Sequence, residues 1–411
     1  MTTDQEIEEA PPLTVPSDHA ASTPILPPAT IGLLGGGQLG RMLGAAGRSM
    51  GYRVVVLDPD PDCPAAAIAD RVVVGAYDDT AAAQELARVS DLVTYELEHV
   101  SLELVRAVAA VVPVRPGVEP LRVTQDRLAE RMFVESAGIA VAPWVAVRTT
   151  DELRAAADRL GLPIRLKAAT GGYDGRGQLR IAAASEIDGA IERLGRPEGE
   201  PLLAERELAF AAELSAIVAR SVDGASVTFP PARNRHDEGI LVESVAPAAL
   251  PQAALDGAVA IAERLALAMD LVGTLTVELF LLPDGSLVVN ELAPRVHNSG
   301  HWTIEGAATS QFEQHVRAVC GLPLGSSRPH GPTAMVNVLG TGPRRSARLR
   351  GVGTALADPL VHLHVYDKRE VFERRKMGHV TATGTTPDRA LERAHAARSR
   401  LHWAADGEEA G

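Results

Sequence analysis

Two glutamates, Glu278 and Glu291, lie at matching positions in a predicted β-hairpin. Two runs rich in apolar and β-branched residues flank Pro283-Asp284-Gly285, and an Asp-Gly pair between such runs is a strong hairpin signal. A two-residue loop at Asp284-Gly285 places Glu278 directly opposite Glu291, and a four-residue loop does the same, whereas a three-residue loop does not. Like charges placed opposite each other repel, and in apolar strands they are costly. Either these are two solvated edge glutamates, or a hard cation such as Mg²⁺ neutralises the pair.

Polar side chains gather directly after the second glutamate. Arg295, His297, Asn298 and His301 follow within a turn that contains proline and glycine. Cationic and amide donors beside a metal-binding carboxylate pair suit the charge that develops on a transferring phosphoryl group. This stretch therefore predicts phosphate chemistry.

A lysine followed by glycines forms a second candidate site. The apolar run Pro163–Lys167 is a predicted strand, and the loop after it has four glycines within seven residues, at positions 171, 172, 175 and 177. The backbone of such a loop approaches phosphates closely. It is not a P-loop, because the lysine precedes the glycines and no Gly-Lys-Ser/Thr follows. The loop is either a mobile flap over phosphates or a flexible hairpin tip.

A further glycine turn, Gly35–Gly40, connects the predicted strand Ile31–Leu34 to the predicted helix Arg41–Met50. It satisfies the G-x-G-x-x-G pattern, and Asp58 lies about where the ribose-binding acid of a dinucleotide site would stand. The pattern alone is weak, since any strand-to-helix turn that holds an anion favours glycines and free N–H groups.

Two more glutamates, Glu96 and Glu98, follow the predicted strand Leu92–Tyr95. They lie at the carboxyl end of that strand, which is the edge where open α/β sheets bind ligands. Each is either a ligand contact or a surface charge.

The elements that position these residues are of α/β and α+β class and form three regions. βα alternation predicts a parallel sheet that ends with a strand at Val111–Val114. A helix near Asp126–Ala137 opens the second region, and a Gly/Pro/Ser-rich break at Gly321–Pro332 closes it. The expected bounds are a disordered extension at 1–28, an N-terminal domain at 29–122, a second domain at 123–325 with a mobile lid at about 145–212, a C-terminal domain at 330–403 and a tail at 404–411.

Composition narrows the class of ligand and the compartment. The net charge of −13 and the pI near 5.4 argue against a broad nucleic-acid surface, so an anionic ligand must meet a local cationic pocket. The two cysteines, Cys63 and Cys320, are far apart in sequence and favour a reducing compartment. No apolar run reaches membrane-spanning length, and the first 28 residues lack the basic and apolar segments of a signal peptide.

Five motifs carry a resemblance that runs from about Ile31 to Leu401. They are Gly35-Gly36-Gly37-Gln38-Leu39-Gly40-Arg41, Thr94-Tyr95-Glu96, Gln125-Asp126-Arg127, Gly172-Tyr173-Asp174-Gly175-Arg176-Gly177-Gln178 and Asn290-Glu291-Leu292-Ala293-Pro294-Arg295-Val296-His297-Asn298-Ser299-Gly300-His301. In these motifs the chain resembles the ATP-grasp superfamily and, within it, the N5-carboxyaminoimidazole ribonucleotide synthetases, the ATPase subunit of bacterial phosphoribosylaminoimidazole carboxylase. The last motif is highly specific to this family, whereas the glycine-rich ones are shared more widely.

The resemblance implies an ATP-grasp fold with an N-terminal parallel-sheet (pre-ATP-grasp, Rossmann-like) domain and a small C-terminal domain. It implies an ATP-dependent C–N ligase that carboxylates 5-aminoimidazole ribonucleotide with bicarbonate, through carboxyphosphate. The products would be N5-carboxyaminoimidazole ribonucleotide, ADP and phosphate, in de novo purine biosynthesis. It further implies Mg²⁺, or Mn²⁺ in its place, a cytoplasmic homodimer, and small-molecule partners with neither nucleic acid nor membrane.

The resemblance also implies a role for each candidate residue. Glu278 and Glu291 would bind the metal, and bicarbonate and carboxyphosphate would be held by the catalytic residues Arg295, His297 and Asn298. Ribonucleotide binding is implied for Gln38, Arg41, Glu96, Tyr173, Asp174, Arg176, Lys368 and Arg375, the last two on the 5′-phosphate. ATP binding is implied for Arg127, Lys167, Tyr173, Asp174, Gly175, Gln178, Glu205, Leu208, Glu213, His236, Asn290 and Glu291. From Gln38 and Arg41 we expect the Gly35–Gly40 turn to serve the ribonucleotide and not NAD.

The chain departs from the family pattern at four positions. The family usually has Lys at Arg131, Asn at His99, Arg at Phe372 and Gly at Arg374. Either Arg374 replaces the cation lost at Phe372, or both side chains face solvent.

Three other functions compete with this hypothesis. A Rossmann oxidoreductase would explain Gly35–Gly40 and leave Lys167 and the glutamate pair without a role. Another ATP-grasp ligase would act on a different amine, and a non-catalytic module would bind the nucleotide only.

Overall fold

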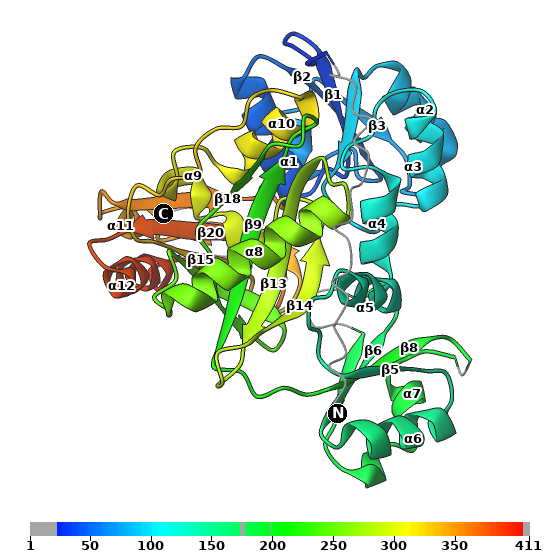
Figure 1. Cartoon of the computed structure of the whole chain (residues 1–411). Coiled ribbons are helices and arrows are strands. Elements are labelled where there is room, and N and C mark those ends of the chain that lie inside the picture. Colours follow the sequence, from blue (N-terminus) through cyan, green and yellow to red (C-terminus); the bar gives the residue numbers. More distant parts are fainter. Residues whose placement is uncertain (1–22, 173–176, 198, 406–411) are drawn as a thin grey trace, which may run out of the picture.

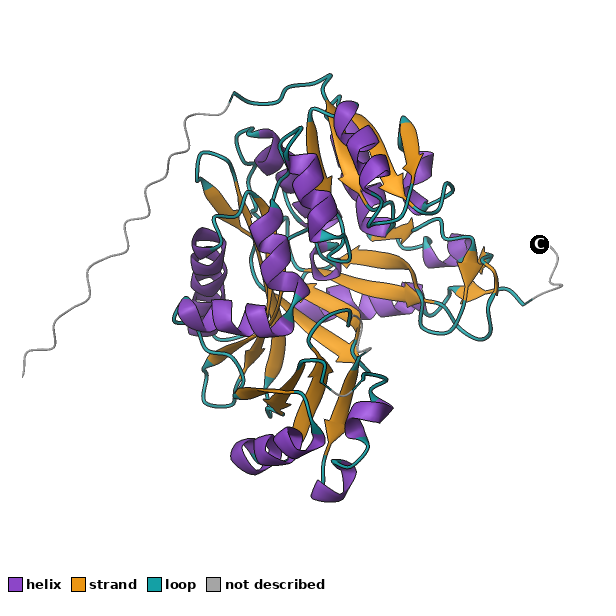
Figure 2. Ribbon diagram, turned by 90° about the vertical axis from the view of Figure 1, so that its right-hand side faces the viewer, coloured by secondary structure: helices purple, strands orange, loops and turns teal. Residues whose placement is uncertain are grey.

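The computed structural model describes residues 23–172, 177–197 and 199–405. Most of the predicted extension, the last residues of the predicted tail, and the flap residues Tyr173, Asp174, Gly175 and Arg176 lie outside these ranges. Within them the chain forms a parallel sheet, a small antiparallel sheet and a large central sheet (Figures 1 and 2).

The first region is a four-stranded parallel sheet in the order β3-β2-β1-β4. Successive residues of β2 face opposite sides, with Val54 and Val56 in one core cluster and Val55 and Leu57 in the other, so the sheet is buried on both faces. The prediction of a strand at Val111–Val114 is wrong, because only an isolated parallel bridge between Val93 and Val114 forms there. The elements are β1 (Thr30–Leu34), α1 (Gln38–Ser49), β2 (Arg53–Asp58), the 3₁₀ turn η1 (Pro64–Ala67), β3 (Arg71–Val74), α2 (Thr80–Arg88), β4 (Leu92–Tyr95) and α3 (Leu102–Ala109).

A pair of helices leads to the small antiparallel sheet, whose order is β5-β8-β6-β7. The single helix expected near Asp126–Ala137 is preceded by a second helix, and Asp126 separates the two in an extended conformation. Its carboxylate accepts the N–H groups of Leu128 and Ala129 and so caps the second helix. The elements are α4 (Val118–Gln125), α5 (Arg127–Ser136), β5 (Trp144–Val147), α6 (Thr150–Leu160), β6 (Ile164–Ala168), β7 (Gln178–Ile181), η2 (Ala184–Glu186), α7 (Ala190–Arg193) and β8 (Leu202–Arg206).

The central sheet runs in the order β14-β13-β9-β11-β12-β15-β20-β18, with β10 beside β9. Strand β15 of the C-terminal region pairs with β12, and β20 pairs with β15, so these strands continue the central sheet instead of forming a separate one. Its first elements are β9 (Ala212–Arg220), β10 (Ser226–Thr228), β11 (Ala232–Asp237), β12 (Ile240–Ala246), α8 (Gln252–Ala268), β13 (Gly273–Leu281), β14 (Leu287–Ala293), η3 (Asn298–Gly300), α9 (Thr303–Gly306) and α10 (Gln311–Cys320). The C-terminal elements are β15 (Thr333–Leu339), β16 (Arg345–Ser346), β17 (Leu349–Arg350), α11 (Val352–Ala355), β18 (Val361–Val365), β19 (Glu370–Val371), β20 (Lys376–Thr383), α12 (Pro387–Arg398) and β21 (His402–Trp403).

Helix α10 joins the second region to the first. Its face of Phe312, Val316 and Val319, predicted to be core, packs in the cluster under β1 and α1. Residues 23–28, which were expected to belong to the disordered extension, are bonded here as well. The N–H of Ile25 donates to the carbonyl of Cys320 at 2.9 Å, and the hydroxyl of Tyr52 donates to the carbonyl of Ile25 at 2.6 Å.

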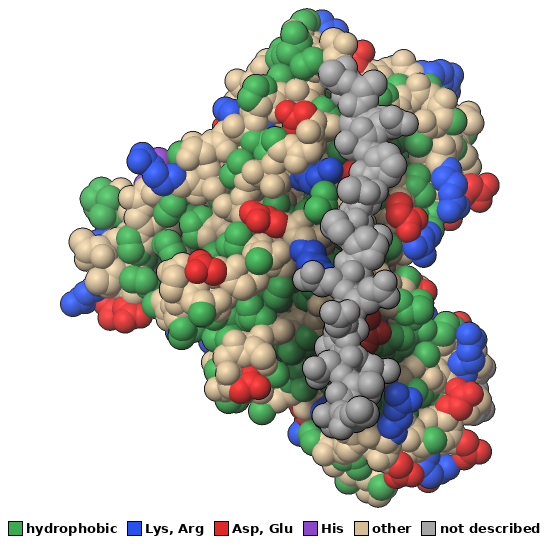
Figure 3. Space-filling view, viewed as in Figure 1, with side chains coloured by type: hydrophobic (Ala, Val, Ile, Leu, Met, Phe, Trp, Pro, Cys, Tyr) green, Lys and Arg blue, Asp and Glu red, His purple; other side chains and the backbone are tan. Residues whose placement is uncertain are grey.

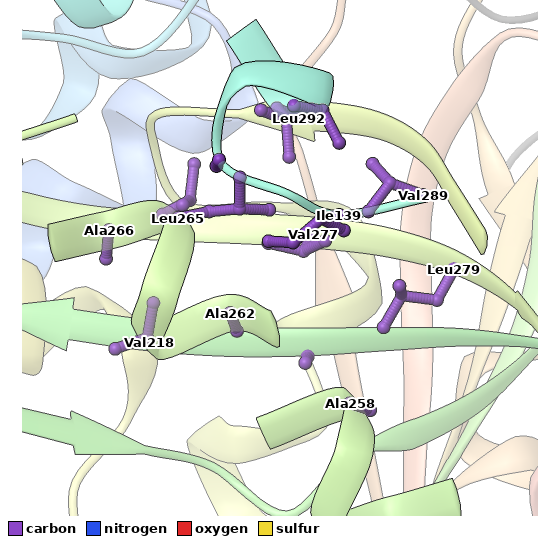
Figure 4. Close-up of a cluster of buried hydrophobic side chains, with 14 of the residues drawn as sticks. Ile139, Val218, Ala258, Ala262, Leu265, Ala266, Val277, Leu279, Val289 and Leu292 are labelled. Atoms are coloured by element: carbon purple, nitrogen blue, oxygen red, sulfur yellow. The ribbon is translucent and has the colours of Figure 1, made fainter. Parts of the chain in front are cut away.

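The alternation of side chains in the β13–β14 hairpin fixes which residues face the site. Val277 and Leu279 pack against the alanine-rich face of α8, as Figure 4 shows, and small residues such as Ala262 let that helix lie close to the sheet. Glu278, between Val277 and Leu279, must therefore point to the opposite face.

The surface carries both charges. Figure 3 shows Lys, Arg, Asp and Glu side chains scattered over the face in view. In the part of the chain that the structure describes, no helix has both the length and the apolar composition to cross a membrane.

Candidate active site

A cavity of about 860 Å³ lies between the small sheet and the central sheet and reaches the carboxyl edge of the parallel sheet. It brings together candidate residues that are far apart in sequence. Those that line it are Gln38, Glu96, Arg127, Lys167, Gln178, Glu205, Leu208, Glu213, His236, Glu278, Asn290, Glu291, Arg295, His297 and Asn298. The candidates Arg41, Lys368 and Arg375 are not among the residues that line it.

The hairpin places Glu278 directly opposite Glu291, as predicted, but through a different turn. Leu281 pairs with Leu287, and the N–H of Leu282 donates to the carbonyl of Ser286, which leaves an odd, three-residue loop. The expectation of a two- or four-residue loop is wrong. A β-bulge at Asn290 supplies the missing residue and restores the pairing of the two glutamates.

The two carboxylates have opposite tendencies to ionise. Burial, reinforced by the negative charges of Glu291 and Glu213, raises the pKa of Glu278. Burial acts in the same direction on Glu291, but the positive charges of Arg127 and Lys167 outweigh it and lower the pKa of that carboxyl. Arg127 Nη1 lies 3.4 Å from Glu291 Oε2. Glu291 therefore lies beside permanent cations, whereas Glu278 lies beside two histidines, with Oε1 at 3.7 Å from His297 Nε2 and 4.0 Å from His236 Nε2.

The pair fits a hard divalent cation that takes its remaining ligands from phosphate and water. Within residues 23–172, 177–197 and 199–405, no three His, Cys, Asp or Glu side chains are placed to hold a metal by themselves. Mg²⁺ is commonly bound through one or two carboxylates together with substrate phosphates, so the two glutamates that line the cavity are sufficient. The raised pKa of Glu278 reflects a negative charge that a cation would neutralise.

Lys167, at the end of β6, is held by a buried ion pair. Its Nζ lies 2.7 Å from Glu205 Oε2, and Arg131 Nε lies 2.9 Å from Glu205 Oε1. Burial would raise the pKa of Glu205, yet the charges of Lys167 and Arg131 lower it to about 2. The fully buried Arg131 also donates to Glu130 and to the carbonyl of Asn290, both at 2.8 Å. Since a guanidinium reaches three acceptors in fixed directions, this departure from lysine is a structural tie and not a surface change.

The segment after β14 is fixed by neighbours from other elements. Arg295 Nε lies 2.7 Å from Glu98 Oε1, and Asn298 accepts from Asn337 Nδ2 at 2.9 Å. His297 Nδ1 lies 2.9 Å from Ser299 Oγ. Burial and the nearby charge of Arg295 lower the pKa of His297 well below its usual range, so its imidazole is neutral at pH 7.

The glycine turn of the parallel sheet is occupied by a side chain of the protein. Glu96 accepts the N–H of Gly37 at 2.7 Å and that of Gly40 at 2.8 Å. A Cβ added at Gly37 would lie 2.6 Å from Glu96 Oε1, which explains the glycine there. Asp58 accepts the N–H of Gly36 and the hydroxyl of Tyr77. The donors that would hold a dinucleotide pyrophosphate are thus already bonded to carboxylates, which argues against the Rossmann hypothesis.

The turn proposed for the 5′-phosphate, from Lys368 to Lys376, lies beside the cavity. Lys368 Nζ donates to the carbonyl of Lys376 at 2.7 Å, and Arg375 donates to the carbonyl of Glu370. The Phe372 ring has the guanidinium of Arg375 at 5.0 Å from its centroid, and that of Arg344 at 4.4 Å. Arg41, in α1, reaches the same region and lies 3.0 Å from Asp367.

Some residues that line the cavity were not predicted from the sequence. Phe210 and Phe280 stack with ring centroids 4.5 Å apart and planes at 4°, and both line the cavity. Phe210 is 43% exposed, which is unusual for a large apolar side chain, and such a flat wall suits a purine base. Lys376 also lines the cavity. The signal for it was present in the Arg375-Lys376 pair, but nothing in the sequence indicates which of the two cations faces inward.

Two antiparallel sheets enclose this cavity, with a lysine on one and a carboxylate pair on the other, and this arrangement defines an ATP-grasp protein. The family comparison agrees. Residues 132–312 match the ATP-grasp domain, residues 28–125 the ribonucleotide synthetase preATP-grasp domain, and residues 333–393 the phosphoribosylaminoimidazole carboxylase C-terminal domain. The predicted fold class is confirmed.

Similarity to individual proteins narrows the class. The N5-carboxyaminoimidazole ribonucleotide synthase of Brucella melitensis is 43% identical over 359 residues, which covers 87% of this chain and 97% of that protein. The N5-carboxyaminoimidazole ribonucleotide synthetase of Thermus thermophilus superposes with a TM-score of 0.82 at 40% identity, over 92% of this chain and 100% of that one. The N5-carboxyaminoimidazole synthase of Aspergillus clavatus, in complex with ADP and 5-aminoimidazole ribonucleotide, superposes with a TM-score of 0.83 at 33% identity, over 90% and 98%. The chain belongs to the N5-carboxyaminoimidazole ribonucleotide synthase family.

Proposed function

We propose that the chain uses ATP and bicarbonate to carboxylate 5-aminoimidazole ribonucleotide on its exocyclic nitrogen. The observation that carries the proposal is a single cavity lined by Lys167, by the Glu278–Glu291 pair and by the segment from Arg295 to Asn298. This chemistry needs three features together: cationic side chains that bind phosphate, a pair of carboxylates that binds a metal, and hydrogen-bond donors for a small oxyanion.

ATP would lie between the two sheets. Phe210 and Phe280 would contact the base, and Glu213, which accepts from His236 at 2.9 Å, would hold the ribose hydroxyls. Lys167 and Arg127 would contact the phosphates. Glu278 and Glu291 would hold Mg²⁺, which when bound offsets the negative charge of the transferring phosphoryl group.

The reaction proceeds in two steps. An oxygen of bicarbonate attacks the γ-phosphorus and the bond to ADP breaks, which gives carboxyphosphate. The amine of the ribonucleotide then attacks the carboxyl carbon, phosphate leaves, and the amine loses a proton. Arg295 would hold the negative oxygens in both steps. His297, neutral at pH 7, would donate or accept a hydrogen bond there without adding charge.

The ribonucleotide would lie toward the parallel sheet. Gln38 and Glu96 line that end of the cavity. Arg41, Lys368 and Arg375 are proposed at its phosphate end, and the candidates Tyr173, Asp174 and Arg176 would close over it.

We extend the proposal to location and assembly. Both cysteines are free and buried, which supports a reducing compartment and hence the cytoplasm. The homodimer is supported by the family resemblance.

The experiment that tests the function is ADP formation with a panel of amines, each with and without bicarbonate. We expect 5-aminoimidazole ribonucleotide with bicarbonate to stimulate ADP release and to yield a carboxylated product. Stimulation by a different amine would favour another ATP-grasp ligase. Nucleotide binding without turnover under every condition would indicate a non-catalytic module.

A further inference from the structure

A turn of the C-terminal region is tied directly to a hairpin at the rim of the cavity. Arg374 Nη2 donates to the carbonyl of Asp237, and Arg374 Nη1 lies 3.1 Å from Asp237 Oδ2 and 3.3 Å from Glu238 Oε2. Asp237 ends β11, and Glu238 begins the turn to β12. One guanidinium therefore holds three acceptors at the tip of the β11–β12 hairpin. We call Arg374, Asp237 and Glu238 the clasp.

Arg374 holds this position in a backbone conformation that favours glycine. Its φ is 64°, in the left-handed region, which is unfavourable for a non-glycine residue. The turn is anchored on Gly340, because the N–H of Arg374 donates to the carbonyl of Gly340 at 2.9 Å and the N–H of Gly340 donates to the carbonyl of Arg375 at 2.7 Å. An arginine in a glycine conformation, with its side chain fully engaged across two elements, indicates a role for that side chain.

The clasp connects two halves of the cavity. On the nucleotide half, Glu238 and Gly239 line the cavity, and His236 directly precedes the clasp residue Asp237. On the other half, Arg374 is followed at once by Arg375 and then by Lys376, which lines the same cavity. His236, which bonds to the proposed ribose contact Glu213, and the proposed phosphate contact Arg375 are thus each directly adjacent in sequence to a clasp residue.

We propose that Arg374 is a positioning residue that couples the nucleotide site to the ribonucleotide site, so that each ligand raises the affinity for the other. The inference rests on the proposed function, since it takes the Lys368–Lys376 turn to hold the ribonucleotide phosphate. A phosphate on that turn fixes the backbone that carries Arg374, and Arg374 then holds the hairpin tip in place against the nucleotide. Coupling of this kind is reciprocal, because the free energy of the doubly bound state does not depend on the order of binding.

The test measures the Kd of 5-aminoimidazole ribonucleotide by calorimetry, without ADP and with saturating ADP. In the wild-type protein we expect ADP to lower this Kd by about 5- to 150-fold, the usual range of coupling between sites. In Arg374→Gly the ratio should fall to about 1, because glycine keeps the backbone conformation and removes the guanidinium. Arg374→Lys should give an intermediate ratio, since an ammonium is a point charge that cannot reach all three acceptors in the same way.

Two comparisons separate coupling from a general loss of structure. Arg389→Ala removes an exposed ion pair with Glu392 in the same region and should keep the wild-type ratio. Asp237→Asn should lower the ratio, and combining it with Arg374→Gly should lower it no further. The melting temperature of Arg374→Gly should stay near wild type.

Two results would overturn the proposal. One is a wild-type ratio of 1, and the other is an Arg374→Gly ratio equal to that of the wild type. Turnover at saturating concentrations of all substrates is measured on the same proteins. An inactive wild-type protein would count against the proposed function, whereas an active one with no coupling counts against the clasp alone.

Discussion

Burial and neighbouring charge act differently on the two glutamates of the hairpin. Burial and the negative charges of Glu291 and Glu213 raise the pKa of Glu278, whereas the positive charges of Arg127 and Lys167 lower the pKa of Glu291. The sequence predicted that the two side chains face each other on the assumption of an even loop, and the pairing holds because the bulge at Asn290 offsets the odd loop. It did not predict the difference between them, since the cations come from β6 and α5, which are remote in sequence.

The difference predicts distinct results for two isosteric changes. Glu278→Gln relieves the repulsion from Glu291 and Glu213, so the melting temperature of the ligand-free protein should stay equal or rise. Glu291→Gln removes the partner of Arg127, so the melting temperature should fall. Turnover should fall at least about 100-fold in both, because each change removes a charge that holds the metal. Calorimetry of the ligand-free proteins and ADP release check the two parts, and near wild-type turnover in both variants would remove the metal site.

Elements were predicted best where local pattern decides them. The β13–β14 hairpin follows from alternation, yet its three-residue loop and the bulge at Asn290 do not, because several loop lengths satisfy the same pattern. The break between α4 and α5 depends on the cap at Asp126, which a continuous helical pattern conceals. Pairing of β15 with β12 joins segments about ninety residues apart, and no local signal indicates such a contact.

The turn after β18 gives a prediction at this scale. Lys368→Ala or Arg375→Ala should raise the KM for 5-aminoimidazole ribonucleotide by about 10- to 150-fold, with little effect on the KM for ATP. A charge-assisted contact to phosphate contributes roughly 1.5–3 kcal/mol. Steady-state kinetics with each substrate varied in turn checks this.

A neighbouring residue supplies the matched control for that turn. Arg369 pairs with Asp60 and Asp62 on the surface, and Arg369→Ala should leave both KM values near wild type. Equal effects of Lys368→Ala on the two substrates would mean that its bond to the carbonyl of Lys376 is structural and that the phosphate is held elsewhere.

In the whole molecule, the three regions predicted from the sequence are packed against one another. Helix α10 packs under the parallel sheet, and the C-terminal strands complete the central sheet. Local motifs allowed the residues of the site to be named from the sequence. Their arrangement could not be predicted, because the site is lined from all three regions and depends on contacts between them. The assignment of residues 23–28 to a disordered extension failed for the same reason, since their partners are Cys320 and Tyr52.

Two truncations test how far the ordered chain extends. Removal of residues 1–22 should leave the melting temperature and turnover nearly unchanged, because that segment is poor in apolar residues. Removal of residues 1–28 should lower the melting temperature by a few degrees, because it also deletes Ile25, which packs in the cluster of α1 and α10. Equal melting temperatures for both proteins would show that the contacts of Ile25 contribute nothing measurable.

The ion pairs of the ligand-free cavity have a consequence for selectivity. Lys167 is paired with Glu205, Arg127 with Glu291 and Arg295 with Glu98. A small anion such as chloride or free phosphate must compete with a carboxylate for each of these cations, and it takes one cationic partner away from that carboxylate. For a nucleotide that arrives with its own divalent cation we expect a lower cost, because the cation would take the place of Arg127 beside Glu291 while the phosphates contact Lys167 and Arg127. We therefore expect the cavity to favour the metal–nucleotide complex as a unit over either ion alone.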